Sequence, residues 1–271
     1  MNICYNHTDT DYRSYVGWQY TEDECQGLFC NEVRSNLLDQ EEQDVFVQDL
    51  EDLAGLPATG FDGERLLADI QAIQEEDLVD QRTWRIGEAF AEVALEKELH
   101  VRFYWNELRD ARNPRGNKTG ADLVGFIEVD GDVLFLFGEA KTSSETTNRP
   151  PQVMTGGGQM EEQLKDLYSD KQKRTILIRY LANKTRNLAN DHPFKEDYKR
   201  ALSSYYTADH PNYQLIGVLV RDVDPDENDI QACYDRLKTE IIAPKGLKLI
   251  ACYIPIAKQN WSTLIDNVET E

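Results

Sequence analysis

The sequence predicts an α/β fold, with a central mixed β-sheet flanked by helices and a small acidic, mostly helical region at the N-terminus. Patterns typical of helices and of strands alternate along most of the 271 residues. Residues 121–141 have a hairpin pattern that is apolar on both faces, which is typical of strands covered on both sides. The negative charge is concentrated before residue 81, which indicates a separate region there.

The acidic region holds most of the net charge of −21. Residues 22–80 contain eighteen Asp and Glu residues and only two Arg residues, a local balance of −16. Apolar positions over 45–57 and 63–73 follow helical spacing. A negative surface repels phosphate backbones, so direct nucleic-acid binding is not expected here. We therefore predict two regions, 1–80 for partner docking or regulation and 81–271 for the chemistry, and a merely solubilising acidic face is the alternative for the first.

The second region begins with a helix and a strand. Apolar residues at helical spacing predict a helix over 83–99, on which Glu88 and Glu92 lie at the edge nearest the sheet. A snorkelling or solvated carboxylate is the alternative to a functional role for both residues, and it is the favoured interpretation for Glu92. A strand is predicted over 101–105, and Gly and Pro then indicate an irregular loop. That loop holds four basic residues, Arg109, Arg112, Arg115 and Lys118. It either binds the backbone of a nucleic acid or is a solvated basic loop.

After the hairpin the pattern alternates between helices and buried strands. A glycine triplet, residues 156–158, fits neither common phosphate-binding spacing, so we expect a hinge or a loop of close approach. The segment 171–189 has a helical pattern rich in Lys and Arg. The segment 193–206 begins at a proline, which is favoured at the first helical position. We predict helices over 159–170, 171–189, 193–206 and 229–242, strands over 213–221 and 248–256, and a short helix at the C-terminus.

The hairpin gathers three charged side chains. Asp130-Gly131 favours a two-residue turn, because type I′ geometry needs positive φ at both central positions. With these two residues as the loop, Asp122 lies directly opposite Glu139, with Cβ atoms roughly 5 Å apart. Side chains alternate between the two faces of a strand, so Lys141 shares a face with Glu139.

Two carboxylates opposite each other repel, so a compensating charge is expected. A divalent cation is the natural candidate, since it prefers hard oxygen ligands. The alternative is a buried ion pair of Lys141 with Glu139 or Asp122 that merely ends the strands. The rest of the hairpin is apolar, with Leu123, Ile127, Leu134 and Leu136 on one face and Val124, Phe126, Phe135 and Phe137 on the other.

Composition excludes several classes of protein. No run of apolar residues is long enough to span a membrane, and the first residues lack the features of a secretory signal. The five cysteines show no spacing typical of a zinc site, so we expect buried free thiols in a reducing compartment. The expectation is a cytoplasmic protein that does not contact membranes.

These motifs resemble the PD-(D/E)xK nuclease superfamily over about residues 83–222. Glu139-Ala140-Lys141 corresponds to the (D/E)xK triplet, and Ala121-Asp122 stands where the family has Pro-Asp, which leaves the metal ligand intact. Within it the chain is similar to the HamA-type nuclease subunits of the bacterial Hachiman antiphage defence system. That similarity rests on Arg85–Ala89 with Glu92, on the glycine-spaced run Gly120–Gly125, and on Phe137–Lys141.

The resemblance implies a restriction-endonuclease-like core that hydrolyses DNA, with Mg²⁺ (or Mn²⁺) bound by Asp122, Glu139 and Glu88. A metal held there lowers the pKa of a bound water and polarises a phosphoryl oxygen. Lys141 then orients the water or stabilises developing charge. The resemblance also implies a helicase subunit that holds the nuclease and releases it when DNA is sensed.

Two other interpretations are open. One is a non-catalytic adaptor whose acidic surface mimics DNA or docks a helicase. The other is a restriction or transposon-type endonuclease, which shares the chemistry and differs in context. Neither strand preference, sequence specificity nor metal number follows from the sequence.

Overall fold

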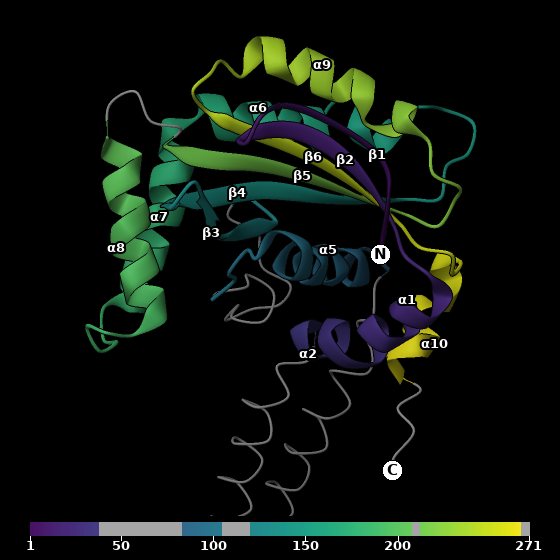
Figure 1. Ribbon diagram of the computed structural model, residues 1–271, viewed down its shortest axis with the longest axis horizontal. Helices are drawn as coiled ribbons and strands as arrows, with labels where there is room; N and C mark the ends of the chain where they lie inside the picture. The colour runs from purple at the N-terminus through teal and green to yellow at the C-terminus, as the bar shows by residue number, and fades with distance from the viewer. Residues whose placement is uncertain (38–82, 105–119, 208–211, 267–271) are drawn as a thin grey trace, which may run out of the picture.

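The computed structural model describes residues 1–37, 83–104, 120–207 and 212–266 (Figure 1). The described residues contain one six-stranded sheet, in the order β1-β2-β6-β5-β4-β3. Strands β2, β6, β5 and β4 run parallel to one another, whereas β1 and β3 pair antiparallel at the two edges. The predicted α/β class with a mixed central sheet is therefore confirmed. The strands are β1 (Asn2–Thr10), β2 (Arg13–Gln19), β3 (Leu123–Val129), β4 (Asp132–Ser143), β5 (Tyr213–Arg221) and β6 (Gly246–Tyr253).

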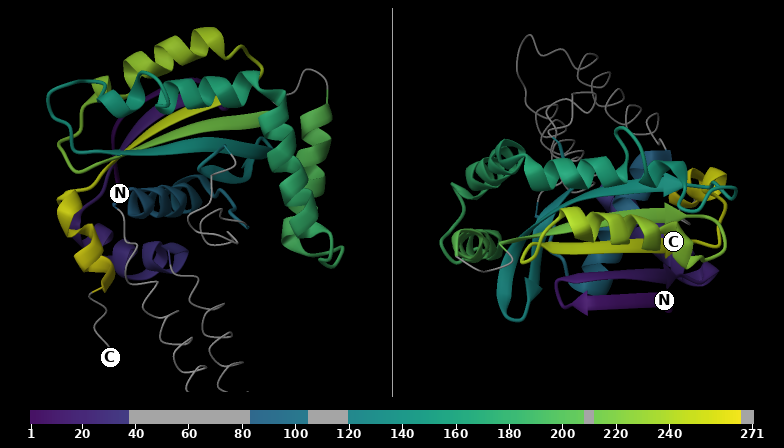
Figure 2. Two further views of the ribbon diagram at one scale, coloured as in Figure 1. Left: turned by 180° about the vertical axis from the view of Figure 1, so that it is seen from behind. Right: turned by 90° about the horizontal axis from the view of Figure 1, so that it is seen from above.

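Helices cover both faces of the sheet (Figures 1 and 2). One face is covered by α5, with α1, α2 and α10 beyond it, and the other by α6 and α9. Helices α7 and α8 lie side by side at the end of the sheet opposite α10. The helices are α1 (Glu22–Leu28), α2 (Arg34–Leu37), α5 (Thr83–Leu99), α6 (Met160–Ser169), α7 (Lys171–Thr185), α8 (Pro193–Tyr206), α9 (Gln231–Glu240) and α10 (Trp261–Asp266), with a π-helical turn, Phe29–Val33, between α1 and α2.

Two apolar cores result, one on each face of the sheet. The hairpin contributes to both, because its side chains alternate. Its Leu and Ile residues pack in the core beneath α5, and its Phe residues pack in the core beneath α6–α9. The predicted assignment of the hairpin faces is confirmed for all eight residues, namely Leu123, Ile127, Leu134 and Leu136 on the first and Val124, Phe126, Phe135 and Phe137 on the second.

The N-terminal residues differ from the prediction. Residues 1–19 are not helical: they form β1 and β2, and β2 pairs in parallel with β6 from the far end of the chain. The sheet therefore crosses the predicted boundary at residue 80. Helix α1 packs Cys25 and Leu28 into the core beneath α5, so residues 22–28 also belong to this fold. The helices predicted over 45–57 and 63–73 lie outside the described residues.

Most other predicted elements are present. Helix α8 and strand β5 have the predicted bounds, and α5 spans the predicted 83–99. The strand predicted over 101–105 is wrong for its described part, since Arg102 makes only an isolated antiparallel bridge to Phe126. The guanidinium of Arg102 instead binds Asp197 of α8, with Nε–Oδ2 and Nη2–Oδ1 distances of 2.6 and 3.0 Å. This bidentate pair ties the segment after α5 to α8, while two backbone hydrogen bonds between Arg102 and Phe126, at 2.9 and 3.0 Å, tie it to β3.

All five cysteines are free thiols. The expected burial holds for Cys25, Cys233 and Cys252, whereas Cys30 is partly buried and Cys4 is exposed on the edge strand β1. Across the described ranges, we find no helix that combines the length and the apolar character needed to cross a membrane.

Candidate active site

The site is built on the β3–β4 hairpin, whose register is the predicted one. Leu123 pairs with Gly138 at one end and Val129 pairs with Asp132 at the turn. Asp122 lies just before the first paired residue of β3. Its Oδ2 accepts a hydrogen bond from the backbone N–H of Ala140, at 3.3 Å. The carboxylate is thus held against β4, beside Glu139.

Glu139 is the electrostatic centre of the cluster. Its side chain is 5% exposed, and its Oε1 contacts the ammonium of Lys141. Burial, followed by the charge of Asp122, raises the pKa of Glu139 from its ordinary 4.5 to about 8, although Lys141 acts in the opposite direction. Desolvation disfavours the charged form of a carboxyl, and a second carboxylate nearby adds to that effect. The site therefore carries too little positive charge to keep Glu139 ionised at neutral pH.

The cluster faces the side of the sheet that α6 covers. Ala140 packs in the core beneath α5, so its neighbours Glu139 and Lys141 project to the opposite face. On the adjacent strand, Gly217 pairs with Glu139. A Cβ on Gly217 would lie 2.7 Å from Met160 Sδ, which shows how closely the first residue of α6 approaches the strand next to the cluster. Lys141 has 21% of its side chain exposed, so the cluster is open to solvent at its ammonium end.

Glu88 lies on α5, which packs on the other face of the sheet. The preceding residue, Gly87, leaves no room for a Cβ beside Thr142, since that atom would lie 2.0 Å from Thr142 Oγ1. Helix α5 therefore packs against Thr142, the residue that follows Lys141 on β4, and lies on the opposite face of the sheet from the cluster. Among the described residues, no three His, Cys, Asp or Glu side chains are close enough to hold a metal ion. The structure brings Asp122, Glu139 and Lys141 together without a third carboxylate, and the role of Glu88 stays a prediction.

Glu92 has a structural contact. It is buried on α5 and its Oε2 accepts a hydrogen bond from Asn36 Nδ2 of α2, at 3.4 Å. This contact joins α5 to the helices that follow β2. The snorkelling or solvated carboxylate expected for Glu92 is therefore wrong, because the side chain is buried and α2 covers it. The loop bearing Arg109, Arg112, Arg115 and Lys118 lies outside the described residues, and its predicted role in nucleic-acid binding is untested.

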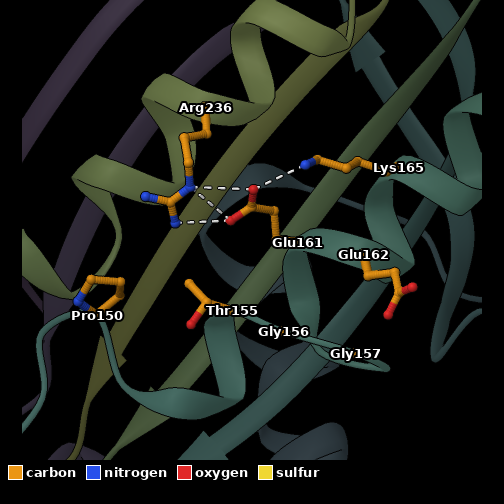
Figure 3. A pocket seen from close by; sticks show the side chains of 8 residues that line it. All are labelled: Pro150, Thr155, Gly156, Gly157, Glu161, Glu162, Lys165 and Arg236. Carbon is orange, nitrogen blue, oxygen red and sulfur yellow. Dashed lines mark hydrogen bonds and ion pairs between the residues drawn. The ribbon is translucent and has the colours of Figure 1, made fainter.

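Two glycines of the triplet, Gly156 and Gly157, line an open pocket of about 650 Å³ beside α6 (Figure 3). Gly156 and Gly158 have φ values of 101° and 72°, a region that favours glycine. A Cβ on either residue would meet nothing within 4 Å, so the predicted loop of close approach is wrong, and the alternative of a hinge stays a prediction. The two basic side chains of the pocket already form ion pairs. Arg236 and Lys165 both bind Glu161, with closest N–O distances of 2.8 and 3.0 Å. The pocket is therefore poorly suited to a phosphate.

A second set of charges, not anticipated from the sequence, lies at the carboxyl end of β5. Arg221 and Asp229 are both fully buried, and Arg221 Nη1 lies 3.3 Å from Asp229 Oδ1. Arg149 Nη1 donates to the same oxygen at 2.8 Å, and the Tyr253 hydroxyl donates to Oδ2 at 3.0 Å. This network anchors the loop after β4. Its only sequence signal is an arginine that ends an apolar strand, which is indistinguishable from a solvated strand end.

Comparison of the chain with protein-family models and with curated proteins finds no match.

Proposed function

We propose that the chain is a metal-dependent nuclease that hydrolyses DNA phosphodiester bonds at the cluster of Asp122, Glu139 and Lys141. The observation that carries the proposal is the pairing of two carboxyl groups, one of them buried, beside an ammonium on a hairpin that otherwise packs apolar residues. A perturbed carboxyl pKa caused by burial and a specific charged neighbour is typical of functional sites. The pKa of Glu139, raised to about 8, meets that criterion.

The donor set fits Mg²⁺ or Mn²⁺. Asp122 and Glu139 offer adjacent oxygen ligands, and a divalent ion there would offset the repulsion that raises the pKa of Glu139. When bound, such an ion supplies an activated water and polarises a phosphoryl oxygen. The Ala140 N–H holds Asp122 in place, and Lys141 can donate a hydrogen bond to the attacking water or to a phosphate oxygen. Glu88 is retained as a further candidate ligand.

The test is cleavage of plasmid DNA by the purified chain with Mg²⁺. Replacing Lys141 by Ala or Glu139 by Gln should lower the cleavage rate by about 10²–10³-fold, the usual loss for a preorganised electrostatic group. Glu128→Gln is the matched control, because Glu128 lies on the same hairpin but is exposed and binds Arg200. Cleavage that survives both site substitutions would refute the site.

A non-catalytic binding protein is the second candidate. One observation favours it: no group of three potential ligands is gathered among the described residues. In that case the Lys141–Glu139 ion pair only neutralises a buried charge. Such a protein would leave the plasmid intact with Mg²⁺ and with Mn²⁺, while both site variants would bind partners as the wild type does.

We further propose a helicase partner in an antiviral defence complex. The support is electrostatic, because a chain with a net charge of −21 binds DNA weakly at physiological salt and would gain from a partner that delivers it. Residues 22–80 are the proposed docking or inhibitory region. Since α1 and α2 contribute to the core or contact it, the test neutralises the acidic residues of 39–80 to Asn or Gln and leaves α1 and α2 intact. Unchanged partner binding and unchanged restraint of cleavage would refute this role.

A further inference from the structure

Helix α7 and the turn after it carry only positive charge. Residues 171–190 contain none of the 50 acidic residues of the chain, although acidic residues outnumber basic ones overall. A solvated face of an acidic protein would be expected to carry both signs, so this segment differs from its surroundings. It contains six basic residues, namely Lys171, Lys173, Arg174, Arg179, Lys184 and Arg186.

One face of α7 is buried and the other is open. Arg174, Leu177 and Leu181 pack inward, and the buried guanidinium of Arg174 binds backbone carbonyls at the end of α6. Arg179 and Arg186 are exposed and seven residues apart, which places them on one stripe about 10 Å apart. Within the described ranges, neither of them forms an ion pair, nor does the exposed Lys171. Their charges are therefore not balanced by neighbouring carboxylates of the described fold.

This helix lies next to the start of the hairpin. The side chain of Lys173 comes within 3.8 Å of the position that a Cβ on Gly120 would occupy, two residues before Asp122. Leu177 and Ala121 belong to the same apolar core. Figures 1 and 2 show α7 and α8 packed together at the end of the sheet that carries β3 and β4. A strand of nucleic acid on α7 would therefore run close to the proposed active site.

We propose that the exposed face of α7, defined by Lys171, Arg179 and Arg186, binds the phosphate backbone of DNA. The guanidinium fork suits phosphate oxygens, and contacts to the backbone carry no sequence information. A chain with a net charge of −21 repels DNA over much of its surface, so a basic face also orients the DNA. That the bound strand enters the cluster of Asp122, Glu139 and Lys141 rests on the proposed function.

The test measures binding of a fluorescent DNA duplex by anisotropy, with EDTA present so that nothing is cleaved. At 0.1 M salt, removing one cation that neutralises a phosphate should weaken binding about eightfold, and the slope of log K against log salt should fall by about 0.9 for each such cation. Arg179→Glu and Arg186→Glu should each weaken binding by at least this much. Lys258→Glu is the control, because it changes the net charge equally in the turn before α10, at the other end of the molecule. Unchanged thermal midpoints would show that the variants are folded.

Three results would overturn the inference: no binding by the wild type, equally weakened binding in the control and the α7 variants, or α7-dependent binding to anionic lipid vesicles with none to DNA. Cleavage separates it from the proposed function. If the α7 variants no longer bind DNA while Glu139→Gln still cuts with Mg²⁺, the surface stands and the active site fails. If Glu139→Gln abolishes cutting while the α7 variants bind normally, the active site stands and this surface fails.

Discussion

Replacing Glu139 by Gln should stabilise the protein in the absence of metal, by an amount that grows with pH. The pKa of Glu139 rises from 4.5 to about 8 on folding, mainly because of burial and Asp122. In the unfolded chain this group ionises near pH 4.5, whereas the folded protein keeps its proton until about pH 8. Stability from this group is therefore fully present below pH 4.5 and is lost as the pH rises through 8. Gln mimics the protonated form and avoids that loss.

The magnitude follows from the pKa difference. One pKa unit corresponds to about 1.4 kcal/mol, so the variant should gain about that much over the wild type for each pH unit. The upper limit at pH 8 is about 5 kcal/mol. The side chain is 5% exposed, so solvent screens the effect little. The weakening of the pair with Lys141 is already included, since Lys141 lowers this pKa and the net shift is still upward.

The assay is urea unfolding in EDTA at pH 5, 6, 7 and 8, followed by fluorescence of the buried Trp18 and Trp261. The free energy of unfolding of Glu139→Gln should nearly equal that of the wild type at pH 5 and exceed it increasingly up to pH 8. Glu128→Gln, at an exposed position of the same hairpin, is the matched control. A gap independent of pH, or a variant less stable than the wild type at pH 8, would refute the reasoning. Adding Mg²⁺ should narrow the gap, because a ligand that binds only the folded wild type stabilises it.

Two further predictions concern the scaffold. Gly138→Ala should destabilise the protein by about 1–3 kcal/mol, because the new Cβ would lie 2.4 Å from a backbone carbonyl oxygen of β5. The control Gly27→Ala on α1 meets nothing within 4 Å and should stabilise the protein by up to about 1 kcal/mol. Thermal unfolding of both variants checks this, and equal effects would contradict it. Arg221→Met should cost about 3–5 kcal/mol by leaving Asp229 buried with fewer partners, and the additional change Asp229→Asn should recover part of it; a double variant no more stable than the single one would show that the pair is not the cause.

Elements specified by neighbouring residues could be predicted from the sequence, whereas pairings between distant segments could not. The Asp-Gly turn determined the hairpin register by itself, and Pro193 marked the start of α8. The first strand of the sheet was missed because β1 is exposed along nearly its whole length and shows no alternation. Strand β2 does alternate, but its partner β6 lies more than 200 residues away, so nothing nearby in the sequence indicates the pairing.

The same distinction between local and long-range features applies to the candidate site. The sequence alone determined that Asp122, Glu139 and Lys141 share one patch, because alternation and register are properties of a single hairpin. Helical spacing predicts Glu88 at the edge of α5 nearest the sheet, but it carries no information on which face of the sheet that helix covers. Only the tertiary structure decided that α5 packs opposite the cluster, and that the basic helix α7 lies beside Gly120. The physical reason is that packing of whole elements minimises exposed apolar area across the entire chain, which no local pattern can encode.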